Sequence, residues 1–205
     1  MTTRTIAVVS AGLSTPSSTR LLADRLAAAT VAALRERGED AVVEVLELRE
    51  HARDVADALV TGFPNAALRA ALGTVTGADA VVAVTPVFTA SYSGLFKSFV
   101  DLLEPESLTG TPVLLAATAG TARHSLVLEH AMRPLFAYLR AGTVPTAVFA
   151  ASEDWAGGDG GGLPARIARA AGELADAVTG RPASARPADP FADVPSFEQL
   201  LGGNG

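Results

Sequence analysis

Residues 79–86, which read DAVVAVTP, decide the fold class of this 205-residue chain. The stretch is a short apolar run rich in valine, which is typical of a strand that is buried on both faces of a parallel sheet. Pro86 has no N–H to donate to a neighbouring strand, so it marks the end of this one. We therefore predict a central strand here, followed directly by a polar loop.

Comparable runs lie on both sides of this strand and alternate with helical patterns. Residues 41–48 (AVVEVLEL) alternate apolar and acidic side chains, as an outer strand of the same sheet does. The other expected strands are residues 5–10, 112–118 and 143–150. Helices are expected at residues 17–37, as two short helices within 52–77, at 93–103, as one long helix at 122–140, and at 163–179. Five strands alternating with helices predict an α/β fold, namely a five-stranded parallel sheet with helices on both faces.

The length of the chain and its distribution of proline and glycine predict one domain with an appendage. At 205 residues, a single core is the natural expectation. We assign residues 1–180 to this domain and residues 181–205, where proline alternates with a few large apolar side chains, to an extended C-terminal tail. The glycine-rich run at 157–162 is interpreted as a flexible loop, because its spacing fits no phosphate-binding motif.

Composition excludes several classes of function. The formal net charge is −6 and the basic residues are scattered, which disfavours a nucleic-acid partner. The chain has no cysteine, and its three histidines stand in no metal-ligand pattern, so we expect no metal site and no thiol chemistry. No stretch approaches the roughly 20 apolar residues of a membrane span, so we expect no membrane contact and a cytoplasmic location. Apolar residues make up 49% of the chain, and we expect some of them to be buried in contacts between subunits.

The loop after the first strand gathers hydroxyl groups at the start of a helix. Ser17, Ser18 and Thr19 can donate hydrogen bonds, and Arg20 adds a full positive charge. A helix N-terminus also offers unpaired N–H groups and about half a unit of positive charge, so the set suits a phosphate group. A serine that only caps the helix explains the same pattern, and these residues alone leave both interpretations open. The spacing matches neither G-x-G-x-x-G nor a P-loop.

Residues 85–103, TPVFTASYSGLFKSFVDLL, closely resemble the flavin-binding segment of the NAD(P)H-dependent FMN reductase family. Residues 117–125 (ATAGTARHS) look like the family's third flavin loop, and the first loop is similar to its phosphate turn. The three loops occur in the family's order. The resemblance implies a flavodoxin-like fold, FMN at the carboxyl ends of the strands, and a homodimer or homotetramer.

The resemblance also implies flavin-binding roles by position. The phosphate would lie at residues 17–20, and residues 86–91 would follow the edge of the isoalloxazine ring, largely through backbone groups. Residues 118–121 would face the pyrimidine side of the ring, where their N–H groups could stabilise negative charge on the reduced flavin. The expected cofactor-binding residues are Ser10, Ser17, Ser18, Thr19, Arg20, Pro86, Val87, Phe88, Thr89, Ala90, Ser91, Thr118, Ala119, Gly120 and Thr121.

Two positions depart from the family pattern. The family commonly has Tyr where this chain has Phe88, so a phenol hydroxyl is missing beside the ring. It commonly has Gly-Gly where this chain has Ala119 and Gly120, and we expect Gly120 to be the one that needs a positive φ. Both changes concern flavin affinity and substrate choice rather than the fold.

The activity that the resemblance implies is hydride transfer from NADPH or NADH to FMN, with the reduced flavin passed to a partner such as a flavin-dependent monooxygenase. Hydride transfer needs stacked rings more than it needs an acid or a base, so we name no catalytic side chain. Two alternatives stay open. One is a quinone or azo reductase that keeps FMN as a prosthetic group, and the other is a flavodoxin-type electron carrier without nicotinamide activity.

Five further residues are interpreted individually. Lys97 and Asp101 are four apart on a helix, which predicts a surface ion pair. Pro134 denies the carbonyl of His130 its helical partner, so we expect an irregularity in the long helix there. His124, beside the third loop, is either a contact to nicotinamide or flavin or a polar residue at a helix start.

Overall fold

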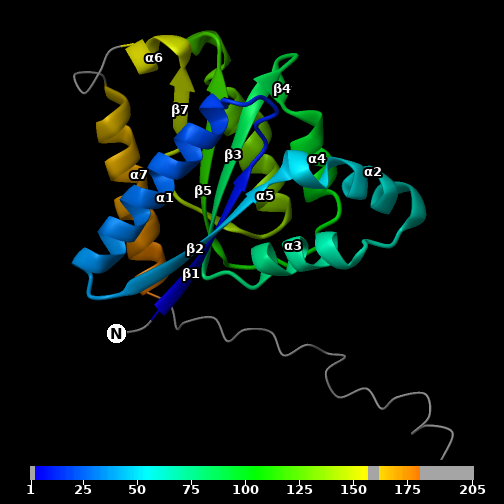
Figure 1. The fold of residues 1–205 in the computed structure, drawn as a ribbon. Coiled ribbons are helices and arrows are strands. Elements are labelled where there is room, and N and C mark those ends of the chain that lie inside the picture. The colour runs from blue at the N-terminus through cyan, green and yellow to red at the C-terminus, as the bar shows by residue number, and fades with distance from the viewer. Residues whose placement is uncertain (1–2, 157–161, 181–205) are drawn as a thin grey trace, which may run out of the picture.

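A parallel sheet is the centre of the molecule, which a computed structural model describes for residues 3–156 and 162–180. Its main strands run in the order β2-β1-β3-β5-β6; β7 also pairs with β5, and β4 folds back antiparallel on β3 (Figure 1). The strands are β1 (Thr3–Ser10), β2 (Asp40–Glu47), β3 (Ala80–Phe88), β4 (Ser91–Tyr92), β5 (Pro112–Ala119), β6 (Gly142–Thr143) and β7 (Val148–Ala151). This strand order is that of the flavodoxin-like fold, so the predicted fold class is confirmed.

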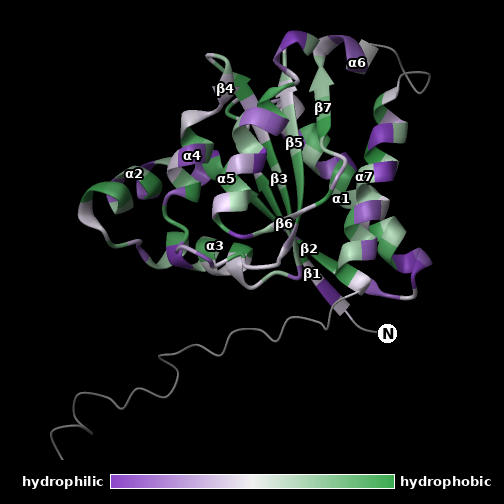
Figure 2. Ribbon diagram, turned by 180° about the vertical axis from the view of Figure 1, so that it is seen from behind, coloured by the Kyte–Doolittle hydropathy of each residue, from purple (hydrophilic) through white to green (hydrophobic). Residues whose placement is uncertain are grey.

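Helices cover both faces of the sheet. The helices are α1 (Ser18–Glu36), α2 (Ala52–Thr61), α3 (Ala66–Thr76), α4 (Gly94–Val100), α5 (Arg133–Tyr138), α6 (Ser152–Ala156) and α7 (Gly162–Thr179). α1 and α7 lie on one face, and α2 to α5 pack on the other (Figure 1). Figure 2 shows hydrophobic strands enclosed between helices whose outer faces carry the polar residues.

The side chains of β1 show why the strands read as continuous apolar runs. Ile6 and Val8 belong to the core beneath α1 and α7, whereas Ala7 and Val9 belong to the core beneath α2 to α5. Successive side chains of a strand point to opposite faces, so a strand covered on both sides must be apolar throughout. The residue pattern therefore encodes the layer structure directly.

β2 is the outer strand on its side of the sheet, as its alternating pattern predicted. It pairs with β1 along eight residues, from Thr3 opposite Asp40 to Ser10 opposite Glu47. The side chain of Val42 on this strand is exposed. The register places Glu47 level with the last residue of β1, at the carboxyl edge of the sheet.

A buried arginine lies at the opposite, amino-terminal end of the same strand pair. Arg4 is only 4% exposed, and its guanidinium donates to Glu39, with 2.9 Å between Nη2 and Oε1, and lies 3.5 Å from Oδ1 of Asp79. The hydrogen bond with Glu39 raises the pKa of Arg4 against the opposing effect of burial, and it lowers the pKa of Glu39. We call Arg4, Glu39 and Asp79 the amino-end ion cluster.

Most predicted helices are confirmed, but the long helix at 122–140 is wrong. That segment is divided into a 3-10 turn (η2, Ala122–His124), a π-helical turn (η3, Leu128–Met132) and α5. Pro134 supplies the physical reason, because its ring has no N–H and crowds the preceding turn. The irregularity expected near Pro134 is confirmed. α4 ends at Val100, three residues before the predicted end.

The predicted strand at 143–150 is interrupted. It forms two short strands, β6 and β7, with Pro145 between them. Val144 still donates its N–H to the carbonyl of Val113 at 2.9 Å, but Pro145 has no N–H with which to continue the ladder. The chain therefore leaves β5 briefly before β7 resumes the pairing.

Two predicted segments lie outside the described residues: the glycine-rich loop, except for Gly162 at the start of α7, and the tail at 181–205. The division between domain and tail stays a prediction. Within residues 3–156 and 162–180, no helix is long and apolar enough to cross a lipid bilayer.

Candidate functional site

A hollow of about 340 Å³ lies at the carboxyl ends of β1, β3, β5 and β7, and we call it the strand-end cavity. In parallel α/β sheets, ligands bind at this edge, beside the point where the strand order reverses, which here falls between β1 and β3. The lining residues are Gly12, Leu13, Ser14, Ser17, Ser18, Thr19, Pro86, Val87, Phe88, Thr118, Ala119, Gly120 and Ser152. None of these lining residues has a charged side chain. The cavity therefore offers neutral hydrogen-bond donors beside apolar side chains.

The first wall of the cavity is the turn between β1 and α1. Ser17 caps α1, because its Oγ accepts a hydrogen bond from the N–H of Arg20 at 3.2 Å. Gly12 lies so close to this cap that a Cβ there would stand 2.1 Å from Ser17 Oγ. Ser18 and Thr19 follow in the first turn of a 19-residue helix, whose N-terminus carries a partial positive charge. Capping and anion binding are thus compatible uses of one turn.

A hydrogen bond between two buried threonines joins the first wall to the third loop. The hydroxyl oxygens of Thr19 and Thr118 are 2.8 Å apart, although the residues are 99 positions apart in sequence. Their exposed fractions are 2% and 4%. Because a buried hydroxyl without a partner is costly, this bond fixes the spacing between α1 and the end of β5. The bottom of the cavity is therefore a rigid floor.

The second loop is a hairpin whose base is held firmly. Thr85 Oγ1 accepts a hydrogen bond from the N–H of Ser93 and donates one to the carbonyl of Pro86, both at 3.0 Å. At the tip, Thr89 and Ala90 have φ values of +47° and +68°, in the left-handed region. Two successive left-handed residues match the twist of a tight hairpin, but residues with a Cβ adopt them at a cost.

The third loop differs from its prediction in one respect. Thr118, Ala119 and Gly120 line the cavity as expected. Neither Ala119 nor Gly120 is among the described residues with positive φ, so the expectation for Gly120 is wrong. The left-handed backbone lies instead at the tip of the neighbouring hairpin, because the tight reversal from β3 to β4 requires it there.

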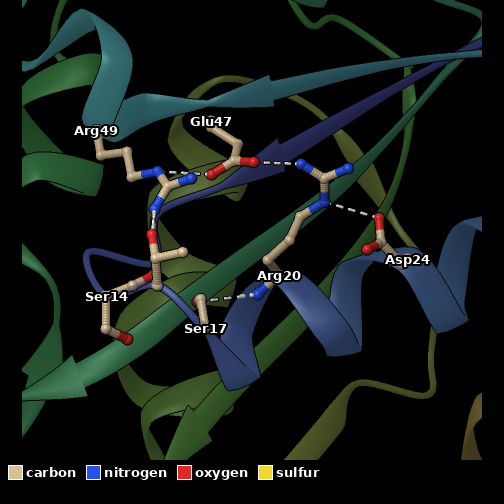
Figure 3. A network of polar contacts seen from close by, with 7 residues as sticks. Ser14, Ser17, Arg20, Asp24, Glu47 and Arg49 are labelled. Atoms are coloured by element: carbon tan, nitrogen blue, oxygen red, sulfur yellow. Dashed lines mark hydrogen bonds and ion pairs between the residues drawn. The ribbon is translucent and has the colours of Figure 1, made fainter.

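Four ionised side chains stand behind the first wall, and we call Arg20, Asp24, Glu47 and Arg49 the carboxyl-end ion cluster (Figure 3). Nε of Arg20 is 2.8 Å from Oδ1 of Asp24, and Nη1 of Arg20 donates to Oε1 of Glu47. The other carboxylate oxygen of Glu47 lies 2.7 Å from Nε of Arg49. The hydrogen bond with Asp24, and then the charges of Asp24 and Glu47, raise the pKa of Arg20 against the effect of burial.

Arg49 also forms hydrogen bonds with the turn that forms the first wall. Its Nη1 donates to the carbonyl of Ser14 at 3.2 Å and to the hydroxyl of Thr15. In Figure 3 the side chains of Arg20 and Arg49 converge on Glu47 from opposite sides. Glu47 is thus the common partner of Arg20 and Arg49.

Ser152, the first residue of α6 directly after β7, forms a fourth part of the lining, which the sequence interpretation missed. Oδ2 of Asp154 accepts the N–H of Ala151 at 2.8 Å, and its Oδ1 lies 2.7 Å from Nη2 of Arg166. Burial acts to raise the pKa of Asp154, but these two contacts outweigh it and the pKa is lowered. The hydrogen bond joins Ala151 and Asp154, which flank Ser152. The rule that ligands bind at strand ends points to the end of β7 as well.

The predicted site residues divide into two groups. Nine of them line the strand-end cavity, namely Ser17, Ser18, Thr19, Pro86, Val87, Phe88, Thr118, Ala119 and Gly120. The other six do not line it. Ser10 is buried at the end of β1, and Arg20 belongs to the carboxyl-end ion cluster. Thr89, Ala90 and Ser91 lie at the hairpin tip, and Thr121 is exposed. Gly12, Leu13, Ser14 and Ser152 were not predicted. The flavin-binding roles of all these residues stay predictions.

The donor set and shape of the cavity fit FMN. Hydroxyl groups, the start of a long helix and a glycine whose Cβ would fill the turn suit a phosphate group. Val87 and Phe88 offer an apolar edge for the ring. Among the described residues, no three histidines or carboxylates converge to hold a metal ion.

Comparison with known proteins identifies the family. The profile of the NADPH-dependent FMN reductase family matches residues 4–156. An FMN reductase (NADPH) of Pseudomonas aeruginosa is 38% identical over 152 residues, which cover 73% of this chain and 78% of that protein. The NADH-dependent FMN reductase SfnE of Pseudomonas putida is 40% identical over 153 residues, 74% of this chain and 78% of that one.

A solved structure agrees with these relatives over a greater length. The crystal structure of an oxidoreductase from Corynebacterium diphtheriae has a TM-score of 0.85 and 50% identity, covering 89% of this chain and 100% of the other. The profile covers every described residue that lines the strand-end cavity. The chain therefore belongs to the NADPH-dependent FMN reductase family and is an NAD(P)H:flavin oxidoreductase that uses FMN with NADPH or NADH.

Proposed function

We propose that FMN is a dissociating substrate of this enzyme and that the reduced flavin is passed to a partner enzyme, such as a flavin-dependent monooxygenase. The observation that carries this proposal is the lining of the strand-end cavity, which offers a flavin phosphate neutral donors and no cation. With few strong anchors, we expect micromolar rather than nanomolar affinity, a difference of about 4 kcal/mol. A flavin held this loosely can leave after reduction.

The phosphate end of FMN would lie at the first wall. Ser17, Ser18 and Thr19 would supply hydroxyl donors, and Ser18 and Thr19 are also the first residues of α1, where backbone N–H groups have no acceptor within the helix. The Gly12 backbone completes the turn without a side chain in the way. These donors orient a phosphate by geometry, because none of them brings a full charge.

The ring end would lie between the second and third loops. Val87 and the half-exposed side chain of Phe88, which is 47% exposed, form its apolar edge. When bound, FMN supplies the atom that accepts a hydride from NADPH or NADH. Phe88 is the only aromatic residue in the described lining, so the ring is not enclosed between two aromatic side chains. An uncovered ring face leaves room for the nicotinamide to stack.

One assay tests the status of the flavin. The purified protein should be colourless or faintly yellow, and its oxidation of NADPH or NADH should rise saturably with added FMN. Riboflavin, which lacks the phosphate, serves as the control and should saturate at a higher concentration. A protein that retains one FMN per chain, with turnover unaffected by added FMN, is instead a reductase with a prosthetic flavin. In that case quinones and azo compounds are the acceptors to test.

We also propose that the chain forms a homodimer or homotetramer. Val60 and Phe63, at the end of α2, and Leu126 and Tyr138, around the π-helical turn, are large apolar or aromatic residues with exposed side chains. Burial of such side chains between subunits is favourable. Light scattering of the purified enzyme measures the mass, and a monomer at micromolar concentration would contradict the proposal.

A further inference from the structure

The phosphate group of FMN carries up to two negative charges, yet none of the described residues that line the strand-end cavity has a charged side chain. The two cations beside its first wall, Arg20 and Arg49, are both held by Glu47. We propose that Glu47 is a positioning residue that keeps Arg20 from the phosphate and thereby weakens the binding of FMN. The inference rests on the proposed binding of the FMN phosphate at the first wall.

The position of Glu47 is set by the sheet. It is paired with Ser10, the last residue of β1, and the turn that forms the first wall begins at once after Ser10. Adjacent strands lie about 4.8 Å apart, so the backbone of Glu47 is one strand spacing from Ser10, directly before the turn that forms the first wall. Its side chain is 16% exposed, which limits screening by salt.

The two arginines are not equivalent in this arrangement. Arg49 is committed to the turn itself through the carbonyl of Ser14 and the hydroxyl of Thr15. Among the described residues, the guanidinium of Arg20 contacts two carboxylates, with Nε on Asp24 and Nη1 on Glu47 (Figure 3). Release of Nη1 would leave Nε anchored on Asp24 and free one edge of a guanidinium in the first turn of α1. Arg20 is therefore the cation that Glu47 keeps away from the phosphate.

The charges of the carboxyl-end ion cluster also predict that Glu47 weakens the binding of FMN. Two guanidinium groups and two carboxylates cancel formally, so an incoming phosphate meets a neutralised cluster. Glu47→Gln keeps the side-chain volume and an acceptor for Arg49 but removes one negative charge. The cluster then has a net charge of +1, and Arg20 can turn one N–H toward the phosphate.

The test is a fluorescence titration of FMN and of riboflavin against the flavin-free full-length protein. Glu47→Gln should lower the dissociation constant of FMN about tenfold, the effect of one charge-assisted hydrogen bond, and should leave that of riboflavin unchanged. Inorganic phosphate should compete with FMN at correspondingly lower concentration. In steady state, the KM for FMN should fall while the KM for riboflavin stays the same.

Two further variants are controls for the effect of Glu47→Gln on FMN affinity. Glu50→Gln removes the same formal charge from an exposed residue that has no ion pair among the described residues, and it should change neither flavin's affinity. In the Arg20→Ala background, Glu47→Gln should bring no gain for FMN. A gain that persists without Arg20 would overturn the proposal, since Glu47 would then act by its bulk charge alone.

Other outcomes also overturn the inference. Equal weakening of both flavins by Glu47→Gln, together with a lower melting temperature, would mean that Glu47 only supports the fold. An unchanged FMN affinity would mean that Arg20 is not withheld. Failure of the proposed function looks different: a retained prosthetic flavin would appear in the wild-type protein, and the ratio of FMN to riboflavin affinity would still report on Glu47 after the flavin is removed.

Discussion

The two ion clusters lie at opposite ends of one strand pair and are built differently. In the amino-end ion cluster, Arg4 is almost fully buried and holds Glu39 and Asp79 away from any described cavity. In the carboxyl-end ion cluster, Arg20 has a side chain that is 35% exposed and lies beside the strand-end cavity. Burial commits an ion pair to the fold because its partners cannot be exchanged without loss. Partial exposure lets the same chemistry exchange partners and act on a ligand.

The largest effect is expected at the amino end. Arg4→Met should lower the free energy of unfolding by about 3–5 kcal/mol, because Glu39 and Asp79 lose their buried cation. Denaturant titration measures the loss. The fraction that remains folded should bind FMN with wild-type affinity, since the strand-end cavity is at the other end of the sheet. A loss of FMN affinity without a loss of stability would contradict the division of roles between the two ends.

A smaller effect, and one centred on binding, is expected at the carboxyl end from Gly12→Ala. The new Cβ would collide with Ser17 Oγ and displace the turn that forms the first wall. Overpacking of this kind costs about 1–3 kcal/mol, which would appear as a loss of FMN affinity of roughly tenfold to a hundredfold. Gly73→Ala is the matched control, because a Cβ there meets nothing within 4 Å and the residue lies in α3. The control should raise stability slightly, by up to about 1 kcal/mol.

The smallest effect is expected from Asp154→Asn, beside Ser152. Its folded-state pKa is lowered, so it contributes stability above its unfolded pKa of about 3.9 and loses that contribution as the pH falls through the folded value. At pH 7 the variant should be less stable by under about 1 kcal/mol, because Arg166 is 41% exposed and solvent screens the pair. Thermal unfolding at several pH values should show the two proteins converge below about pH 4. A difference that grows on acidification would refute this sign.

The parts of the molecule that the sequence predicted are those with a local signal. Valine-rich runs flanked by turns indicated buried strands, and the ends of three of them placed the three predicted cavity loops. Ser152 was missed although the strand at 143–150 was predicted, because the residues after that strand resemble no flavin-binding loop of the family. Pro134 indicated an irregular helix, but one proline cannot specify whether the chain forms a kink, a 3-10 turn or a π-helical turn.

The parts that could not be predicted depend on residues distant in sequence. Arg20 was expected to face a phosphate because it follows three hydroxyl residues, yet Glu47, 27 positions later, reaches it through strand pairing. No local pattern announces that contact. Gly120 suggested backbone freedom where it stands, while the hairpin required it at Thr89 and Ala90, where the sequence has no glycine. The residue type limits the conformations and contacts that a position can adopt, and the tertiary fold determines which of them occur.

The eight-residue pairing of β1 with β2 links the positions of the two ion clusters, because both clusters depend on the same register. Thr3 pairs with Asp40 at one end of this register, next to Arg4 and Glu39, and Ser10 pairs with Glu47 seven residues further along, a span of about 23 Å at 3.3 Å per residue. A slip of one residue would pull Arg4 away from Glu39 and turn Glu47 to the opposite face of the sheet, away from Arg20. A buried contact at one edge of the protein thus holds in alignment the charges at the other.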